Sequence, residues 1–247
     1  MDKVASGWIN GFIGVVIFAG SLPATRAAVI DFDPIFLTCA RASLAALLGL
    51  VLLLVLGQRR PQPSEMPALA LVALGVVVGF PLLTALALQH ISSAHSIVFI
   101  GLLPLCTSLF GVLRAGERPR PTFWLFSILG SAFVVGYAVM SGIEASLRGD
   151  MLMLAAIVVC GLGYAEGARL SRQLGGWQVI SWALVLSLPI MLPAALLTLP
   201  TSFDHVGAAA WSGLIYVSLF SMLIGFVFWY RGLAQGGIAT VGQLQLL

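Results

Sequence analysis

The chain has 247 residues, of which 60% are hydrophobic and only 9% are charged, and its mean hydropathy is +1.07. Soluble domains carry about 25% charged residues, so this composition excludes an ordinary water-soluble fold and predicts that lipid is the main solvent. The net charge of +3 does not indicate nucleic-acid binding, because the arginines lie at the ends of apolar blocks and form no stripe or cluster.

Apolar blocks follow one another along the chain, each close to the length of about 20 residues that crosses a bilayer as a helix. Continuous runs of this kind favour helices over the alternating strands of a membrane barrel. The first run begins near Gly7 and is long enough to span, so we expect no cleaved signal peptide. We expect eight full spans, at residues 7–25, 34–56, 67–88, 94–113, 122–140, 151–170, 178–199 and 208–229.

A ninth apolar block begins near Ile238 and reaches Leu247. Ten residues are too few to cross a bilayer as a helix, so we expect a truncated chain that lacks most of helix nine.

The positive charges predict the orientation of the chain in the membrane. With a cytoplasmic N-terminus, nine Lys and Arg residues fall in inner segments and two in outer segments, while Arg41 lies within a span. This asymmetry predicts a multi-pass protein of the cell inner membrane with its N-terminus in the cytoplasm.

The number of spans suggests an internal repeat. Five spans precede the segment 141–150, so the next block starts from the opposite side of the membrane, as in the inverted repeats of many secondary transporters. The join ALALQHISSAH between spans three and four also resembles YRGLAQGGIAT before the ninth block. We therefore expect an all-α polytopic membrane protein with two inverted five-helix repeats, residues 1–142 and an incomplete 149–247.

Several short motifs follow one another along the chain. They are Trp8 in a Gly-rich first span, Arg41 within DPIFLTCARASLAALLG, the LLP that ends at Pro104, Glu117 within GERPRP, and GLAQGGIATVGQLQLL. Together they resemble the EamA-type branch of the drug/metabolite transporter superfamily over essentially the whole chain. The resemblance implies ten helices in two inverted units, with both termini cytoplasmic. It also implies a central cavity lined by helices one to four and six to nine, and transport of amino acids, other metabolites or drugs.

Two charged residues inside spans are candidates for the mechanism. Arg41 lies about 10 Å into the second span at 1.5 Å per residue. An arginine at this depth should face the bundle interior, where it either binds an anion such as a carboxylate or bonds to backbone carbonyls as a structural residue. Glu166 lies near the inner end of the sixth span, three residues before Arg169. It is either a proton-coupling carboxylate or half of an interfacial ion pair.

Aromatic residues supply further candidates for substrate binding. His95 opens the fourth span and can titrate near physiological pH or donate to a substrate, although it is also typical of a helix start in a wet loop. Phe99 lies one turn further on and is either cavity wall or simple packing. Tyr164 is the aromatic residue that we expect in the cavity, because organic substrates favour apolar pockets with a few polar groups.

Two amides and one proline complete the set of candidates. Gln243 and Gln245 are two residues apart and therefore point to different faces, so we expect at most one to face the cavity, and we assign that role to Gln243. Pro104 stands at the family's proline position, where it predicts a hinge.

Motifs for other chemistries are missing from the sequence. Cys39, Cys106 and Cys160 lie in apolar runs without metal-ligand neighbours, so we expect no metal and no cofactor. Lys3 is the single lysine, which excludes a P-loop in this chain, and we expect transport without ATP. We expect a secondary transporter that exports amino acids or related compounds by alternating access, with proton coupling or none. A non-transporting scaffold or receptor is the alternative, and an intramembrane enzyme is disfavoured because no catalytic cluster is present.

Overall fold

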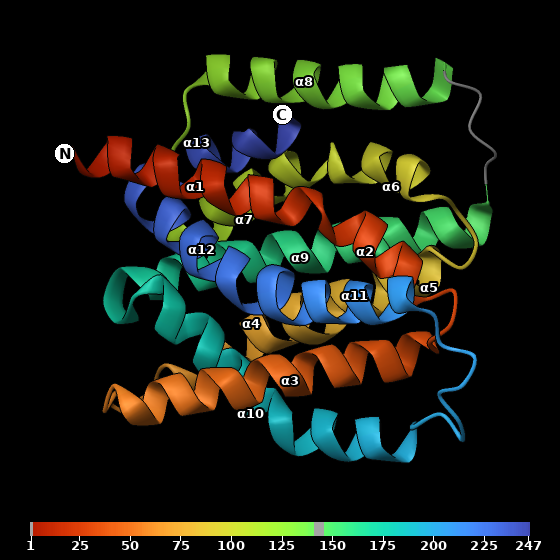
Figure 1. The fold of residues 1–247 in the computed structure, drawn as a ribbon. Coiled ribbons are helices and arrows are strands. Elements are labelled where there is room, and N and C mark those ends of the chain that lie inside the picture. The colour runs from red at the N-terminus through yellow and green to blue at the C-terminus, as the bar shows by residue number, and fades with distance from the viewer. Residues whose placement is uncertain (1, 141–145) are drawn as a thin grey trace.

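The computed structural model describes residues 2–140 and 146–247, and the regular structure of these residues is entirely helical (Figure 1). Within these residues, seven helices or joined helices are long and apolar enough to cross a membrane. They are Lys3–Ala28, Pro34–Val55, Met66–Ala87, Ser93–Ala115, Leu147–Leu174, Gly176–Leu197 and Ala208–Gly236. The shorter apolar segment Pro121–Phe133 opens a further helix. Each of the eight predicted spans overlaps one of these segments, which confirms an all-helical polytopic membrane protein.

Four of the spans are divided into shorter pieces, and the π-helical pieces are named η1 and η2. The elements are α1 (Lys3–Ala19), α2 (Ser21–Ala28), α3 (Pro34–Val55), α4 (Met66–Val72), η1 (Ala73–Gly79), α5 (Phe80–Ala87), α6 (Ser93–Ile100), α7 (Leu103–Ala115), α8 (Pro121–Met140), α9 (Leu147–Leu174), α10 (Gly176–Leu197), α11 (Ala208–Tyr216), η2 (Val217–Ile224), α12 (Gly225–Gly236), α13 (Ile238–Gly242) and the 3-10 turn η3 (Gln243–Leu246).

Local sequence explains where the helices begin. Asp33 accepts hydrogen bonds from the backbone N–H groups of Ile35 at 2.8 Å and Phe36 at 3.1 Å, and Pro34 between them has no N–H to satisfy. Ser92 caps α6 in the same way by accepting from the N–H of His95 at 3.1 Å. These caps place Arg41 and His95 at fixed depths from the same side of the bundle.

The broken spans meet near the centre of the bundle. A break at Gly101 and Leu102 separates α6 from α7, and the π-helical segments η1 and η2 interrupt two other spans. The first residues of η1 and η2 are 144 positions apart in the chain, and their last residues are 145 apart. π-Helical turns are rare in proteins and occur often at functional sites.

Glycine allows α1 and α12 to pack with their backbones in contact. A Cβ atom at Gly7 would lie 2.5 Å from the backbone nitrogen of Gly236, and one at Gly232 would lie 2.6 Å from that of Gly11. Small residues permit such close approach between membrane helices. On the outside of the bundle, α3 and α10 lie on one side and α8 lies on the other (Figure 1). Ser131 of α8 donates to the carbonyl of Gly101 at 2.6 Å, at the break between α6 and α7.

Candidate functional site: a central cavity with one buried arginine

A cavity of about 270 Å³ lies among the broken spans. Its walls come from α1, α2, α3, η1, α5, α6, α7, α9, η2, α12 and the C-terminal turn η3. Among the described residues that line it, five have polar side chains and the others are apolar. The polar residues are Ser21, Arg41, Tyr164, Ser221 and Gln245.

Arg41 carries the cavity's positive charge, and its side chain is held by neutral groups. The residue is 6% exposed, and its terminal nitrogen donates to the carbonyl of Val217 at 3.3 Å and to the hydroxyl of Ser221 at 3.2 Å. Its Nε atom is buried without a hydrogen-bond partner in the part of the chain that the structure describes. No acidic residue lines the cavity within that part. The guanidinium group is thus bonded only to neutral groups, in a buried environment that strengthens charge pairing.

A short hydrogen-bond chain connects Arg41 to two of the broken spans. Ser221 lies in η2, and its hydroxyl accepts from Ser21 at 2.8 Å. Ser21 is the first residue of α2, directly after the break at Gly20. These bonds join α3 to η2 and to the junction of α1 with α2.

Phe18, Tyr164 and Phe226 line the cavity with aromatic rings, and Trp229 packs behind them. Tyr164 packs edge-to-face on Phe226, with ring centroids 5.9 Å apart, and on Trp229 at 5.4 Å. Phe18 completes the group through its contact with Phe226 at 5.1 Å. Such rings suit the apolar body of an organic molecule, while Arg41 supplies a fixed polar contact.

The predicted residues His95 and Phe99 lie outside the cavity lining. His95 Nε2 is 2.7 Å from Asp150 Oδ1, which joins α6 to α9, and the imidazole ring stacks on Phe99 at 5.9 Å. Their neighbours Ile97 and Ile100 line the cavity instead. A role for His95 and Phe99 in binding stays a prediction.

The two C-terminal glutamines have different surroundings, and the sequence alone does not select between them. Gln243 donates to the hydroxyl of Ser108 at 3.4 Å and lies outside the cavity lining, whereas Gln245 lies within it. Of the two, Gln245 is the one that lies at the cavity, and a binding role for Gln243 stays a prediction. Pro104 lies in the first turn of α7, just after the break at Gly101 and Leu102, and its hinge role also stays a prediction.

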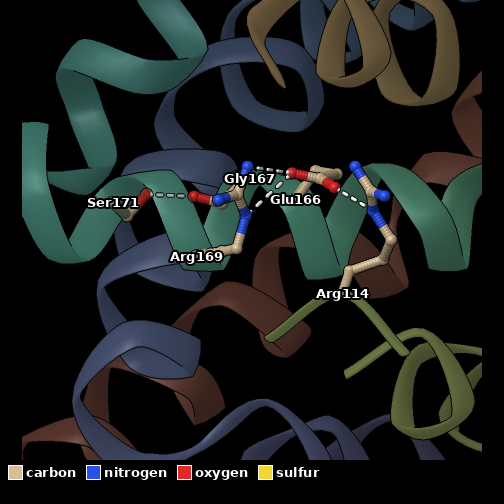
Figure 2. A network of polar contacts seen from close by, with 5 residues as sticks. All are labelled: Arg114, Glu166, Gly167, Arg169 and Ser171. Carbon is tan, nitrogen blue, oxygen red and sulfur yellow. Dashed lines mark hydrogen bonds and ion pairs between the residues drawn. The ribbon is translucent and has the colours of Figure 1, made fainter. Parts of the chain in front are cut away.

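Glu166 is not among the residues that line the cavity and lies in a cluster of ion pairs (Figure 2). Its side chain is fully buried, and one carboxylate oxygen accepts from Nε of Arg114. The other oxygen accepts from Arg169 at 3.0 and 2.8 Å. The contact with Arg169 follows from the spacing of three residues along α9, but Arg114 comes from α7 and has no such local signal. Both oxygens of Glu166 are therefore occupied.

Glu117 forms a second polar contact near the end of α7. Its carboxylate oxygens accept from the backbone N–H groups of Ile238 and Ala239, both at 2.8 Å. Arg172 of α9 donates to the same carboxylate at 2.8 Å. Negative charge is favourable at a helix N-terminus, so Glu117 stabilises the start of α13 and joins it to α7 and α9.

Metal binding has no support in the described residues, since no three His, Cys, Asp or Glu side chains among them are grouped to hold an ion. The described cysteines are free thiols, with Cys39 and Cys160 buried and Cys106 partly buried.

Comparisons with known proteins place this geometry in a family context. The family model described as "EamA-like transporter family" matches residues 5–139 and 147–247. The protein named "Uncharacterized transporter YdeK" from Bacillus subtilis is 67% identical over the whole chain, which covers 86% of that protein. The "Probable terminal-alkyne amino-acid exporter" of Streptantibioticus cattleyicolor is 25% identical, with 92% of this chain and 76% of that protein aligned. A solved crystal structure with 20% identity has a TM-score of 0.76 and covers 98% of this chain and 85% of its own.

Proposed function

This chain belongs to the EamA-like transporter family and is a multi-pass membrane transporter rather than an enzyme, and from that premise we propose that it exports small organic metabolites, amino acids or related compounds, as a secondary transporter. The family resemblance predicted from the sequence is thereby confirmed. The substrate class and the direction of transport belong to the proposal, as does the alternating-access mechanism.

The observation that carries the proposal is the single charged residue in the cavity lining. Among the described lining residues, Arg41 alone has a charged side chain, and the remaining wall is mostly apolar. A buried arginine in a membrane span is costly and normally faces a partner or a pathway. The arrangement fits a substrate with one carboxylate and a compact apolar body, which describes the apolar amino acids.

Support for a two-repeat mechanism comes from the cavity walls. Residues 145 positions apart line the same cavity in four cases: Ala19 with Tyr164, Val76 with Ser221, Pro81 with Phe226, and Ile100 with Gln245. The family model also matches the chain in two segments on either side of residues 140–146. We propose that residues 1–142 and 149–247 are the two repeats and that they rock about this cavity.

The ion pairs around Glu166 and Glu117 fit a closed end of the transporter. The proposed orientation puts Arg114, Arg169 and Arg172 on the cytoplasmic side. In that orientation the ion pairs hold α7, α9 and α13 together on the cytoplasmic side of the cavity. Substrate that enters from the cytoplasm then requires these helices to separate. Glu166 is the candidate for proton coupling, because protonation would weaken its bonds to both arginines.

Uptake into liposomes tests the proposal. The purified protein is reconstituted, and counterflow of labelled amino acids and of organic cations is measured for the wild type, Arg41→Ala and the exposed control Arg148→Ala. We expect saturable movement of apolar amino acids by the wild type and by Arg148→Ala. Arg41→Ala should lose at least 90% of it, because one charged hydrogen bond contributes about 1.5–3 kcal/mol.

Two outcomes would overturn the proposal. If folded and inserted wild-type protein moves nothing on the panel, a scaffold or receptor function replaces transport. If the wild type moves organic cations as well as amino acids and Arg41→Ala reduces both equally, Arg41 is structural. An imposed pH gradient that accelerates counterflow in the wild type but not in Glu166→Gln would support proton coupling.

A further inference from the structure

The cavity contains a second polar group whose hydrogen bonding is incomplete. Gln245 lies in η3, and its side-chain amide oxygen is buried without a partner among the described residues. The same cavity holds the unpartnered Nε of Arg41. Buried polar atoms are normally bonded, so an unsatisfied atom in a cavity indicates a partner that arrives with the ligand.

We propose that Gln245 is a specificity-determining residue, which accepts a hydrogen bond from a donor group of the substrate while Arg41 binds its carboxylate. This inference rests on the proposed transport function and adds to it a requirement for two groups on the substrate. Arg41 and Gln245 bind different groups, because a guanidinium group only donates hydrogen bonds and the amide oxygen of Gln245 accepts one.

The two serines near Arg41 are already hydrogen-bonded. Ser21 donates to Ser221, and Ser221 in turn accepts from Arg41. Tyr164 also lines the cavity, and its hydroxyl interacts with the amide group of Gln245. The amide oxygen of Gln245 has no hydrogen-bond partner among the described residues, so it can accept from a substrate donor. No acidic side chain competes for that donor among the described lining residues. The amino group of an apolar amino acid meets this requirement, whereas the corresponding 2-oxo acid leaves the amide unsatisfied.

The position of Gln245 strengthens the assignment. Its counterpart 145 residues earlier is Ile100, which lines the cavity from α6 and has no polar atom in its side chain. The two repeats therefore place an apolar and a polar side chain at matching places on the wall. In a site built to bond a donor group, a substrate that lacks the donor is rejected because the amide stays unpaired.

The test uses three labelled probes with one side chain: leucine, its 2-oxo acid 4-methyl-2-oxopentanoate, and the amine 3-methylbutylamine. Counterflow in liposomes is measured for the wild type, Gln245→Met and the control Gln235→Met. The control also carries a buried amide oxygen without a partner among the described residues, but it lies outside the cavity lining. Methionine keeps the length of glutamine and removes the amide.

We expect the wild type to prefer leucine over the 2-oxo acid by about tenfold or more, which is the contribution of one hydrogen bond to a charged group. Gln245→Met should reduce leucine transport to the level of the 2-oxo acid and leave the 2-oxo acid unchanged, whereas Gln235→Met should keep the wild-type preference. The amine should move poorly in all three proteins, because it has no group for Arg41.

Failure of this inference is distinguishable from failure of the proposed function. Equal transport of leucine and the 2-oxo acid by the wild type, or an unchanged preference in Gln245→Met, would refute the role of Gln245 while leaving transport established. Absence of transport for every probe would refute the proposed substrates as well. Thermal unfolding of each variant in detergent shows whether a loss is due to misfolding. If Gln245→Met unfolds, Gln245→Asn should then lower the preference for leucine by shortening the reach of the amide, and an unchanged preference would refute the role.

Discussion

Arg41 and Glu166 are both charged residues buried within spans, but their surroundings differ. Glu166 is fully buried and is neutralised by two arginines whose side chains are 45% and 42% exposed. Arg41 is 6% exposed and bonds to a carbonyl and a hydroxyl, with no carboxylate beside it in the described part of the chain. A buried charge that is neutralised by its own chain joins helices, and we propose that Arg41, which has no counter-charge among the described residues, is kept for a ligand.

Mutation should therefore lower stability at Glu166 and binding at Arg41. Breaking a buried ion pair leaves an uncompensated charge and is strongly destabilising. Removing a charge that never had a partner relieves a desolvation penalty instead, and the loss appears in binding. Functional sites commonly trade stability for activity in this way.

The largest effect is expected when Glu166 loses both of its partners. The double variant Arg114→Gln, Arg169→Gln leaves a fully buried carboxylate without a cation. We expect the free energy of unfolding to fall by about 3 kcal/mol, the lower end of the range for a broken buried pair, because the two arginines are partly exposed. Chemical unfolding in mixed micelles measures the change.

The control for this prediction removes the stranded charge as well. Adding Glu166→Gln to the double variant should restore much of the lost stability, since an amide costs less to bury than a carboxylate. If the triple variant is less stable than the double, neutralisation is not what holds Glu166 in place.

A smaller loss is expected for Glu117, which stabilises α13 from the end of α7. Glu117→Ala removes the acceptor for the N–H groups of Ile238 and Ala239 and frees Arg172. Loss of a helix cap costs about 1–2 kcal/mol. Hydrogen exchange at Ile238 and Ala239 should accelerate in Glu117→Ala and change less in Glu117→Gln, which keeps one acceptor oxygen. Equal exchange in all three proteins would contradict the capping role.

The sequence predicts these sites unevenly, and the reasons are physical. Hydropathy gives the spans, and the depth of Arg41 follows from the rise of a helix, so both are predictable. The pair of Glu166 with Arg169 is also local, because residues three apart share a helix face. The contacts of Glu166 with Arg114 and of Glu117 with Ile238 join residues 52 and 121 positions apart, and no periodicity encodes them.

Which of Gln243 and Gln245 faces the cavity cannot be predicted from the sequence, for a different reason. Both belong to one polar turn, and which side faces the cavity depends on the rotation of η3 against α7 and α8. Contacts of Gln243 with Ser108 and of Leu246 with Gly130 fix that rotation in the structure. A helical register that is set by packing partners cannot be read from the segment itself.

Arg41 gives a sharper test, because its stability effect should be small. We expect Arg41→Met to change the free energy of unfolding by less than about 1 kcal/mol, since the two bonds lost are 3.2–3.3 Å long and the buried charge disappears. Arg41→Lys keeps the charge and serves as the comparison, with a lower affinity for carboxylates because the bidentate geometry is lost. A loss above about 2 kcal/mol in Arg41→Met would mark Arg41 as structural.

The smallest effect is expected from an ion pair outside the spans, between Arg59 and Glu65. Glu65 accepts from the backbone N–H of Gln62 at 2.7 Å and from Arg59 at 2.9 Å, and these bonds, the backbone one first, lower the pKa of Glu65 below its usual 4.5. A carboxyl with a lowered pKa in the folded state stabilises the protein above the unfolded pKa, and that contribution is lost as the pH falls through the folded pKa.

The stability difference between the wild type and Glu65→Gln should therefore be constant at neutral pH and shrink below about pH 4.5. Because Arg59 is 51% exposed, salt should reduce the difference further, unlike the buried bonds of Glu166. A difference that does not change with pH would mean that Glu65 acts through packing rather than through its charge.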